Sequence, residues 1–289
     1  MKMLLADGWV QRDARTEVID PDDGSVIGTV PRASAADMQH AITDAEAGAE
    51  NARNLPVHAR MKVLNGAADR IETDLERFAQ IIAREGVKTI REARKEVARA
   101  AVTLRLSAEE ARRVEGRTIA FDQAPGSENR SGYYRLDPVG IVGAITTYND
   151  PLNLVAHKVG PAIAAGNAVI VKPDSKTPLS ALELAKALQE AGLPDGVLQV
   201  VTGEGREVGN VLVEDPRVRL ISFTGGRATG EAISRQAGLK KVAMELGSNA
   251  PVIVMDDADI EMAVEANVSG AFWAAGQNCL HVQRLLIHE

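Results

Sequence analysis

Val139-Gly140-Ile141-Val142-Gly143-Ala144-Ile145 is a short, continuous apolar run, which is typical of a strand buried on both faces of a sheet. Further apolar runs follow it along the chain: Ala168–Val171, Val197–Val201, Leu220–Phe223, Val242–Met244 and Pro251–Met255. Most of them are separated by segments of helical pattern: Leu152–Ala165, Leu179–Ala191, Arg206–Val213 and Ala228–Gln236. Alternating strands and helices predict an α/β fold, in which helices cover both faces of a parallel sheet. Ligands bind such sheets beyond the carboxyl ends of the strands.

The segment before this run has two parts. Residues 8–30 have the pattern of short strands punctuated by turns, and residues from about 34 to 115 have a helical pattern. Ser34 and Thr73 are each followed three positions later by an acidic residue, a capping-box spacing that predicts a helix start at both. Most of the many Arg and Glu residues on these helices are expected to form a solvated face.

Residues 116–136 interrupt the helical pattern. Gly116, Pro125-Gly126 and Ser131-Gly132 bracket polar, strand-like segments that have no clear core face. A hairpin extending from the body and a disordered loop fit this pattern equally well.

The composition limits the classes of function. The 289 residues suffice for two domains or one large one, and 45% hydrophobic and 25% charged residues are ordinary for a soluble globular protein. The net charge of −7 argues against a nucleic-acid surface. A single cysteine excludes an internal disulfide, and the N-terminal apolar run is too short for a signal peptide. No segment is long enough to cross a membrane, so we expect a cytoplasmic protein.

The only cysteine, Cys279, lies in Ala275-Gly276-Gln277-Asn278-Cys279, and Glu245 lies upstream in Met244-Glu245-Leu246-Gly247. A thiol that attacks a carbonyl and a carboxylate that activates water are the minimum for catalysis through a thioester. A lone cysteine is more often a small buried apolar residue, although the Gly-Gln-Asn-Cys context favours a nucleophile. Glu245 could be a buried structural carboxylate, but an uncompensated buried charge is costly.

Other polar residues follow the predicted strands. Asn149, after the first strand, carries an amide that can hold a developing oxyanion. Lys172 ends the second strand and can reach a ribose or phosphate. Gly225-Gly226 follows the fourth, where glycines let backbone amides face a pyrophosphate, although the spacing is not Gly-x-Gly-x-x-Gly. Each of these signals is weak alone.

In combination, the motifs resemble the aldehyde dehydrogenase superfamily. They are Tyr148-Asn149-Asp150-Pro151, Lys172-Pro173, Phe223-Thr224-Gly225, Glu245-Leu246-Gly247 and Gly276-Gln277-Asn278-Cys279, in the family's order and spacing. The resemblance runs from near residue 8 to the end of the chain. It implies an aldehyde dehydrogenase fold, with a Rossmann-like parallel sheet and a truncated catalytic domain.

The resemblance also implies a domain organisation. Residues 1–115 would supply N-terminal strands and helices of the cofactor domain, and 116–136 an oligomerisation-type hairpin. Residues 137–248 would form the NAD(P)-binding core, and 249–289 the start of the catalytic domain. The full-length form would be a homo-oligomer, a dimer or tetramer.

The roles of the site residues follow from the same resemblance. Cys279 would be the nucleophile, Asn149 and the Cys279 backbone amide the oxyanion hole, and Glu245 the base for thioester hydrolysis. The cofactor-binding residues would be Thr146, Thr147, Lys172, Ser175, Lys176, Gly225, Gly226 and Leu246. A thiohemiacetal would lose hydride to NAD or NADP, and water would then release the acid.

Some positions depart from the family pattern. Gly226 stands where a Ser is common, and Ser248 where a second Gly is common. Three residues after Lys172, many NAD-preferring members carry Glu, whereas this chain has Ser175 followed by Lys176. Because no carboxylate repels a 2′-phosphate there, we expect NADP to be accepted.

The substrate is expected to be a small aldehyde. The segment from Tyr148 to Lys158 looks closest to phosphonoacetaldehyde, non-phosphorylating glyceraldehyde-3-phosphate and lactaldehyde dehydrogenases. Arg105 and His157 are candidates for holding an anionic group. Asn278 stands where related anion-binding enzymes can have Arg, which weakens this hypothesis.

The position of Cys279 near the last residue leads us to expect a fragment, in which Val282–Ile287 is an unpaired apolar edge strand. Two other classes of function compete with a dehydrogenase. One is a non-catalytic NAD(P)-binding remnant, and the other is a thiol hydrolase or acyl transferase that uses no nicotinamide.

Overall fold

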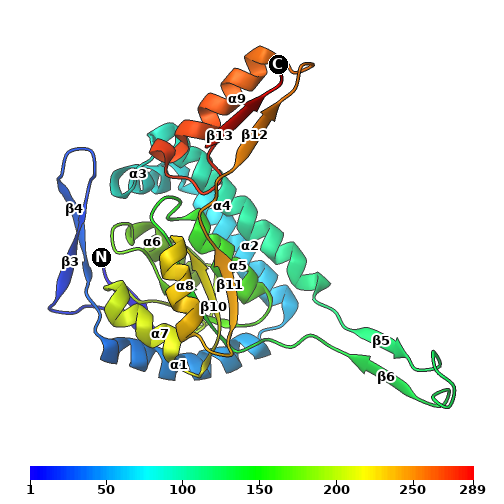
Figure 1. Ribbon diagram of the computed structural model, residues 1–289. Helices are drawn as coiled ribbons and strands as arrows, with labels where there is room; N and C mark the ends of the chain where they lie inside the picture. The colour runs from blue at the N-terminus through cyan, green and yellow to red at the C-terminus, as the bar shows by residue number, and fades with distance from the viewer.

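The computed structural model describes residues 1–289 and is built around one seven-stranded sheet, with strand order β11-β10-β7-β8-β9-β1-β2 (Figure 1). The strands are β1 Met3–Leu5, β2 Gly8–Val10, β7 Ile141–Ile145, β8 Ala168–Lys172, β9 Leu198–Val200, β10 Val218–Thr224 and β11 Lys241–Glu245. β7 to β11 are parallel, and β1 and β2 extend the edge antiparallel to β9. The predicted parallel sheet is confirmed.

Helices cover both faces of this sheet. The α-helices of the chain are α1 Ala35–Asn54, α2 Val57–Thr73, α3 Leu75–Glu85, α4 Ile90–Glu110, α5 Asn153–Ala164, α6 Leu179–Glu190, α7 Asn210–Glu214, α8 Arg227–Gln236 and α9 Ile260–Phe272, the last of which belongs to the C-terminal unit described below. Alternate strand residues enter two apolar cores: Val169 and Val171 pack with α2, α4, α5 and α6, whereas Ile170 packs with α1, α7 and α8. None of the helices combines the length and hydropathy needed to span a bilayer.

The helix starts follow local capping chemistry. Ser34 caps α1 in a capping box with Asp37, as expected. The second predicted box is wrong, because α2 continues through Thr73, whose hydroxyl donates back to the Asp69 carbonyl. Thr89 forms a capping box with Glu92 at the start of α4 instead.

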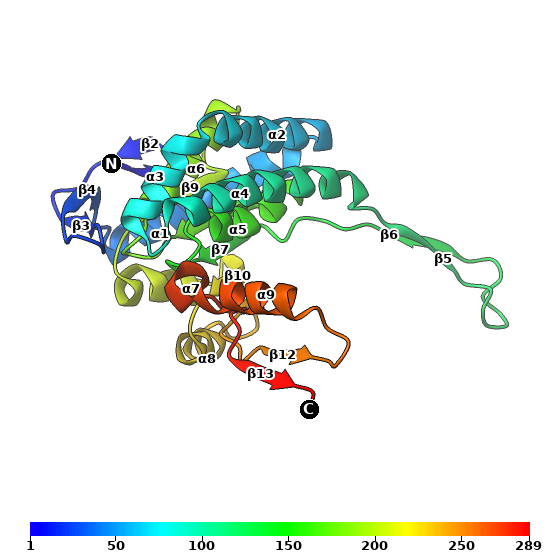
Figure 2. The same ribbon diagram turned by 90° about the horizontal axis from the view of Figure 1, so that it is seen from above.

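Two hairpins extend from the body. β3 (Arg15–Ile19) pairs with β4 (Val26–Pro31), and β5 (Arg117–Ala120) pairs with β6 (Ser131–Tyr134). The β5–β6 ribbon projects away from all other elements (Figures 1 and 2). Of the two patterns left open for residues 116–136, the structure therefore shows the hairpin.

The C-terminal residues form a small separate unit. Its strands, β12 (Pro251–Val254) and β13 (Arg284–Ile287), pair in parallel, and α9 connects them (Figure 1). Two expectations are corrected here. β12 does not extend the run of strands in the central sheet, and β13 is not unpaired, because all four of its residues are in register with β12. Every residue of β13 nevertheless remains exposed.

Candidate active site

The strand register aligns the predicted site residues at one edge of the sheet. Ile145, the last residue of β7, lies opposite Lys172 on β8 and Phe223 on β10. Thr224, next along β10, lies opposite Glu245 on β11. The loops that leave β7, β8, β10 and β11 therefore start from the same edge, where parallel sheets bind ligands.

An open groove of about 1120 Å³ runs along this edge. Five of the predicted cofactor residues line it: Thr146, Thr147, Lys172, Gly225 and Gly226. Ser175, Lys176 and Leu246 do not line it. Ser175 accepts a hydrogen bond from Lys172 at 3.4 Å, and the Lys176 ammonium lies 5.9 Å from the ring centre of Tyr148, another lining residue. Sequence reasoning missed Arg32 and Arg206 in the lining, since neither lies in a recognisable motif.

Nearby carboxylates compensate only in part for the burial of the Lys172 ammonium. Burial lowers the pKa of its ammonium, and the carboxylates of Asp174 and Glu204 offset that effect in part. Its hydroxyl partner, Ser175, donates in turn to the Gly203 carbonyl at 3.1 Å. The ammonium thus retains unused donors at the groove, where a ribose hydroxyl or phosphate can accept them.

The backbone at Gly225 is packed closely against a side chain. A Cβ there would lie 2.5 Å from the ring of Phe223. The Gly225 amide donates to the Glu245 carbonyl at 3.0 Å, and α8 begins two residues later. The Thr224 hydroxyl oxygen is buried without a hydrogen-bond partner. A helix N-terminus, an unpartnered hydroxyl and the Lys172 cation together fit the anionic phosphates of a dinucleotide.

Asn149 lies in the loop between β7 and α5. Its side-chain oxygen is buried and has no hydrogen-bond partner. The next residue, Asp150, is also buried and pairs with Lys88 and Arg99. The loop is therefore fixed in place by ion pairs beside the proposed oxyanion-binding amide.

Cys279 lies partly buried in a tight turn after α9. Its Sγ lies 3.6 Å from Oδ1 of Asn278, and the Ser248 hydroxyl donates to its backbone carbonyl. Ala274 and Ala275, just upstream, both have a positive φ, at 52° and 56°, which is unfavourable for residues with a Cβ. The turn that presents the thiol is thus entered through strained backbone and restrained by Ser248.

Glu245 is the last residue of β11, and it is exposed. It is therefore not a buried structural carboxylate. Lys158 on α5 is a neighbour that sequence reasoning did not identify. Burial lowers the pKa of Lys158 to about 8, against the opposing effect of the Glu245 carboxylate, and its ammonium donates to the Ser222 hydroxyl at 3.1 Å.

Arg105 does not lie at this edge. Its guanidinium pairs with Asp69, at 2.8 Å, and with Glu72, both on α2. Thr103, two residues earlier on α4, faces α5 instead, where its hydroxyl donates to the side chain of Asn153 at 3.0 Å. Two positions along a helix correspond to roughly 200°, so the two side chains point in opposite directions.

The two candidate histidines differ in position. His157 is exposed on α5, and its Nε2 lies 3.4 Å from the Thr103 hydroxyl. Partial burial of the ring and the cations of Arg99 and Lys158 lower its pKa, although Glu245 raises it. His281, whose sequence neighbourhood could suggest a catalytic base, lies against the Asn278 carbonyl within its own turn.

Comparison with known proteins gives a consistent result. The model of the aldehyde dehydrogenase family matches residues 9–289. A putative aldehyde-dehydrogenase-like protein y4uC of Sinorhizobium fredii is 57% identical over 94% of this chain and 53% of its own length. Aspartate-semialdehyde dehydrogenase 1 of Pseudomonas canavaninivorans is 54% identical over 94% of this chain and 58% of its own.

Solved structures agree with the sequence matches. NADP-dependent glyceraldehyde-3-phosphate dehydrogenase from Bacillus halodurans C-125, complexed with NADP, superposes with a TM-score of 0.95 at 37% identity and covers 100% of this chain. The chain spans between 53% and 61% of the length of these three proteins. The family expected from the sequence motifs is confirmed, and the chain belongs to the aldehyde dehydrogenase family.

Proposed function

We propose that the protein of which this chain forms all or part oxidises a small aldehyde to its carboxylic acid through a thioester on Cys279, with NAD or NADP as hydride acceptor. The observation that carries this proposal is the alignment of Lys172 and Glu245 along one groove-forming edge of the sheet. Asn149 lies in a loop that leaves the same edge.

The first step is attack by the Cys279 thiolate on the aldehyde carbon. A sulfur–carbon bond forms, and the carbonyl oxygen becomes an oxyanion. The Asn149 side-chain amide and the Cys279 backbone amide would donate hydrogen bonds to that oxygen, and loss of one such donor costs roughly 10²–10³ in rate. A nicotinamide bound in the groove would supply the acceptor for the hydride that leaves the same carbon. The product on the protein is a thioester.

The second step releases the acid. The Glu245 carboxylate takes a proton from water, the resulting hydroxide attacks the thioester carbon, and the sulfur–carbon bond breaks. The net reaction converts aldehyde, water and oxidised cofactor into acid, reduced cofactor and one proton. Loss of the base lowers the rate of this step by a factor of roughly 10²–10⁴. The exposure of Glu245 supports this role, because the carboxylate can reach water.

Both cofactors should be accepted. Ser175, three residues after Lys172, places no carboxylate at the position where many NAD-preferring members carry Glu. Arg32 and Arg206 add two cations to the groove lining, which also contains the carboxylates of Asp174 and Glu204. The dehydrogenase from Bacillus halodurans, which resembles this chain, was solved with NADP.

The substrate we favour is a short aldehyde that carries an anionic group. The relative from Pseudomonas canavaninivorans is named for aspartate semialdehyde, whose side chain and carboxylate fit that description. His157 is the remaining candidate contact. Its lowered pKa favours the neutral ring, which would donate an N–H to the anion.

We expect the protein in a reducing, cytoplasmic compartment, because such a compartment keeps its single cysteine as a free thiol. We expect the projecting β5–β6 ribbon to contact other copies in a homo-oligomer, because its residues have little contact with the body. Sedimentation of the chain with and without residues 116–136 would check this.

The test follows the appearance of reduced nicotinamide with aspartate semialdehyde, lactaldehyde and acetaldehyde. We expect turnover with NADP as well as NAD, no turnover for Cys279→Ala, and an acyl adduct that accumulates on Glu245→Gln and is detected by its mass. Strong discrimination against NADP would overturn the cofactor proposal.

Two other results would identify the competing functions. Cofactor binding, measured by calorimetry, with no aldehyde-dependent reduction would indicate a non-catalytic NAD(P)-binding protein. Cys279-dependent hydrolysis of thioesters without any binding of nicotinamide would indicate a thiol hydrolase.

A further inference from the structure

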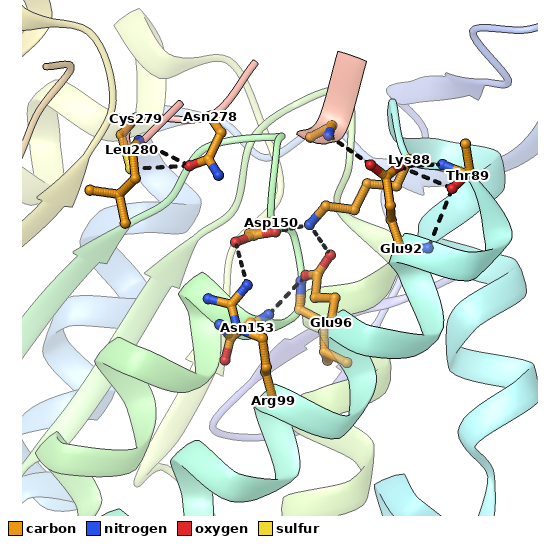
Figure 3. Close-up of polar contacts among 12 residues, drawn as sticks. Lys88, Thr89, Glu92, Glu96, Arg99, Asp150, Asn153, Asn278, Cys279 and Leu280 are labelled. Atoms are coloured by element: carbon orange, nitrogen blue, oxygen red, sulfur yellow. Dashed lines mark hydrogen bonds and ion pairs between the residues drawn. The ribbon is translucent and has the colours of Figure 1, made fainter. Parts of the chain in front are cut away.

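The charged side chains of Lys88, Glu96, Arg99 and Asp150 lie close together (Figure 3), and Asp150 directly follows Asn149. The Lys88 ammonium pairs with Glu96 at 2.6 Å and with Asp150. The side chains of Lys88 and Glu96 are 1% and 0% exposed, and that of Asp150 is 12% exposed. Arg99, half exposed at the rim, lies 3.8 Å from the other oxygen of Asp150. These two cations and two anions balance, and we call them the Lys88 cluster.

Glu96 holds the start of α5. Its Oε1 accepts hydrogen bonds from the backbone amides of Leu152 and Asn153, at 2.9 and 3.0 Å. No side chain of α5's own segment caps this end of the helix. A carboxylate supplied by α4 therefore takes the place of a local cap and fixes the first turn of α5.

Lys88 joins that contact to the loop itself. Its ammonium pairs with one carboxylate oxygen of Glu96 and with one of Asp150. The Asp150 side chain and the backbone of Leu152 and Asn153 that follows it are therefore tied to the start of α4. Asn149 precedes Asp150 directly and uses its own side chain in none of these contacts. Its amide is thus oriented by its neighbour while remaining free to bind another group.

The same end of α4 contacts the segment that leads to the thiol. The Lys88 ammonium lies 5.8 Å from the ring centre of Trp273, and that of Lys95 lies 5.6 Å from it. The Ala274 amide donates to the Glu92 carboxylate at 3.2 Å. The first turns of α4 therefore touch both the Asn149 loop and the approach to Cys279.

Stability alone does not account for this arrangement. Desolvation of buried ions costs several kcal/mol each, and apolar residues of similar volume often replace such a pair with no loss of stability. Burial lowers the pKa of Lys88, which shows that desolvation opposes its charge more than its partners favour it. The charged side chains instead fix the position of the backbone next to Asn149.

We propose that Lys88 is a positioning residue, which acts through Glu96 and Asp150 to hold the Asn149 amide at the correct place relative to the thiol of Cys279. The proposal rests on the proposed function, since it assumes that Asn149 stabilises an oxyanion. Lys88 itself touches no reacting atom in this scheme.

The test uses acylation of Cys279 by p-nitrophenyl acetate, measured as a burst of p-nitrophenolate in the absence of nicotinamide. This reaction needs the thiol and the oxyanion hole only. Lys88→Met should lower the burst rate at least about tenfold, up to the roughly 10²–10³ limit for losing the donor itself. In a protein that already carries Asn149→Ala, adding Lys88→Met should change the burst rate by no more than about twofold, because both substitutions act through the Asn149 amide.

Two further variants separate positioning from general damage. Lys95→Met is the matched control, because it removes the other ammonium over Trp273 without touching Asp150 or Glu96, and its burst should equal that of the unaltered chain. Lys88→Arg should recover part of the rate. Alkylation of Cys279 by iodoacetamide, which forms no oxyanion at a carbonyl, should be the same in Lys88→Met and in the unaltered chain.

Several outcomes would overturn the inference: an unchanged burst in Lys88→Met, an equal loss in Lys95→Met, multiplied losses in the double variant, or no burst from the unaltered chain. If Lys88→Met fails to fold by circular dichroism, Asp150→Asn takes its place with the same expected loss. Failure of the whole protein to reduce nicotinamide would remove the proposed function, whereas the burst would still decide the role of Lys88.

Discussion

At the scale of single residues, Glu85 shows how burial changes a charge. It lies at the end of α3, where its carboxylate accepts hydrogen bonds from the Leu179 and Ser180 amides and the Ser180 hydroxyl. Burial raises its pKa from an ordinary value of 4.5 to about 8, although these donors lower it. The folded protein therefore keeps a proton that the unfolded chain loses as the pH rises from 4.5 to 8.

This difference predicts that Glu85 makes the protein less stable as the pH rises through that window. The free energy of unfolding should fall by at most about 1.4 kcal/mol per pH unit relative to Glu85→Gln, which stays neutral throughout. Urea denaturation of both proteins at pH 5, 6.5 and 8 would measure the difference. If the unaltered protein instead became more stable relative to Glu85→Gln as the pH rises, the effect of the three donors on the pKa of Glu85 would outweigh that of burial.

His157 carries the prediction about substrate charge. Loss of its N–H donor in His157→Ala should raise KM for aspartate semialdehyde about tenfold, as expected for one hydrogen bond to a charged group, and leave KM for acetaldehyde nearly unchanged. Arg105→Gln is the control, since Arg105 pairs only with Asp69 and Glu72 on the surface. Equal changes in KM for the two aldehydes would remove His157 from the substrate site.

At the scale of elements, α1 packs against the sheet through a glycine. A Cβ on Gly48 would lie 2.0 Å from the carbonyl oxygen of Gly196, which leads into β9. Gly48→Ala should therefore cost about 1–3 kcal/mol of stability as overpacking. Gly209→Ala, where a Cβ meets nothing within 4 Å and φ is −68°, should stabilise slightly. The two melting temperatures should move in opposite directions, and a shared direction would contradict this account.

The elements also show how far the sequence could be interpreted. The continuous apolar runs predicted β7, β8 and β9 well, because a strand buried on both faces needs no polar position. They also predicted β10 and β11, although β11 is largely exposed. The helix start expected at Thr73 was mispredicted, because its hydroxyl bonds backward within α2 rather than forward into a cap. The pairing of β12 with β13 depends on strands far apart in the chain, which local pattern does not encode.

The candidate site was predictable only in part for a similar reason. Residues at strand ends belong to motifs that a sequence displays directly, as Lys172 and Glu245 do. Lys88 pairs with Asp150 across the fold, and on a helix rich in Arg and Glu it is indistinguishable from the solvated residues around it. Arg105 was expected to hold the anionic group of a substrate, yet only the packing of α4 against α2 shows that it pairs with Asp69 and Glu72.

At the scale of the whole molecule, the central sheet and the C-terminal unit differ in burial. Every residue of β8 is buried, whereas α9 buries none and β13 is exposed throughout. Hydrogen exchange followed by mass spectrometry should therefore find the amides of β8 among the slowest and those of β12, α9 and β13 among the fastest within regular structure. Equally slow exchange in β8 and β13 would contradict this expectation.

The edge of the sheet sets an order of events during synthesis. Leu4 in β1 pairs with Val200 in β9, which lies 196 positions (200 − 4) later in the chain. At translation rates of about 5–20 residues per second, roughly 10–40 s pass between the two. Met3, Leu4 and Leu5, all fully buried in the finished fold, remain without this strand partner for that time. These early apolar residues are thus among those that wait longest for their place in the sheet, and a chaperone that shields apolar nascent chain could bind them during that interval.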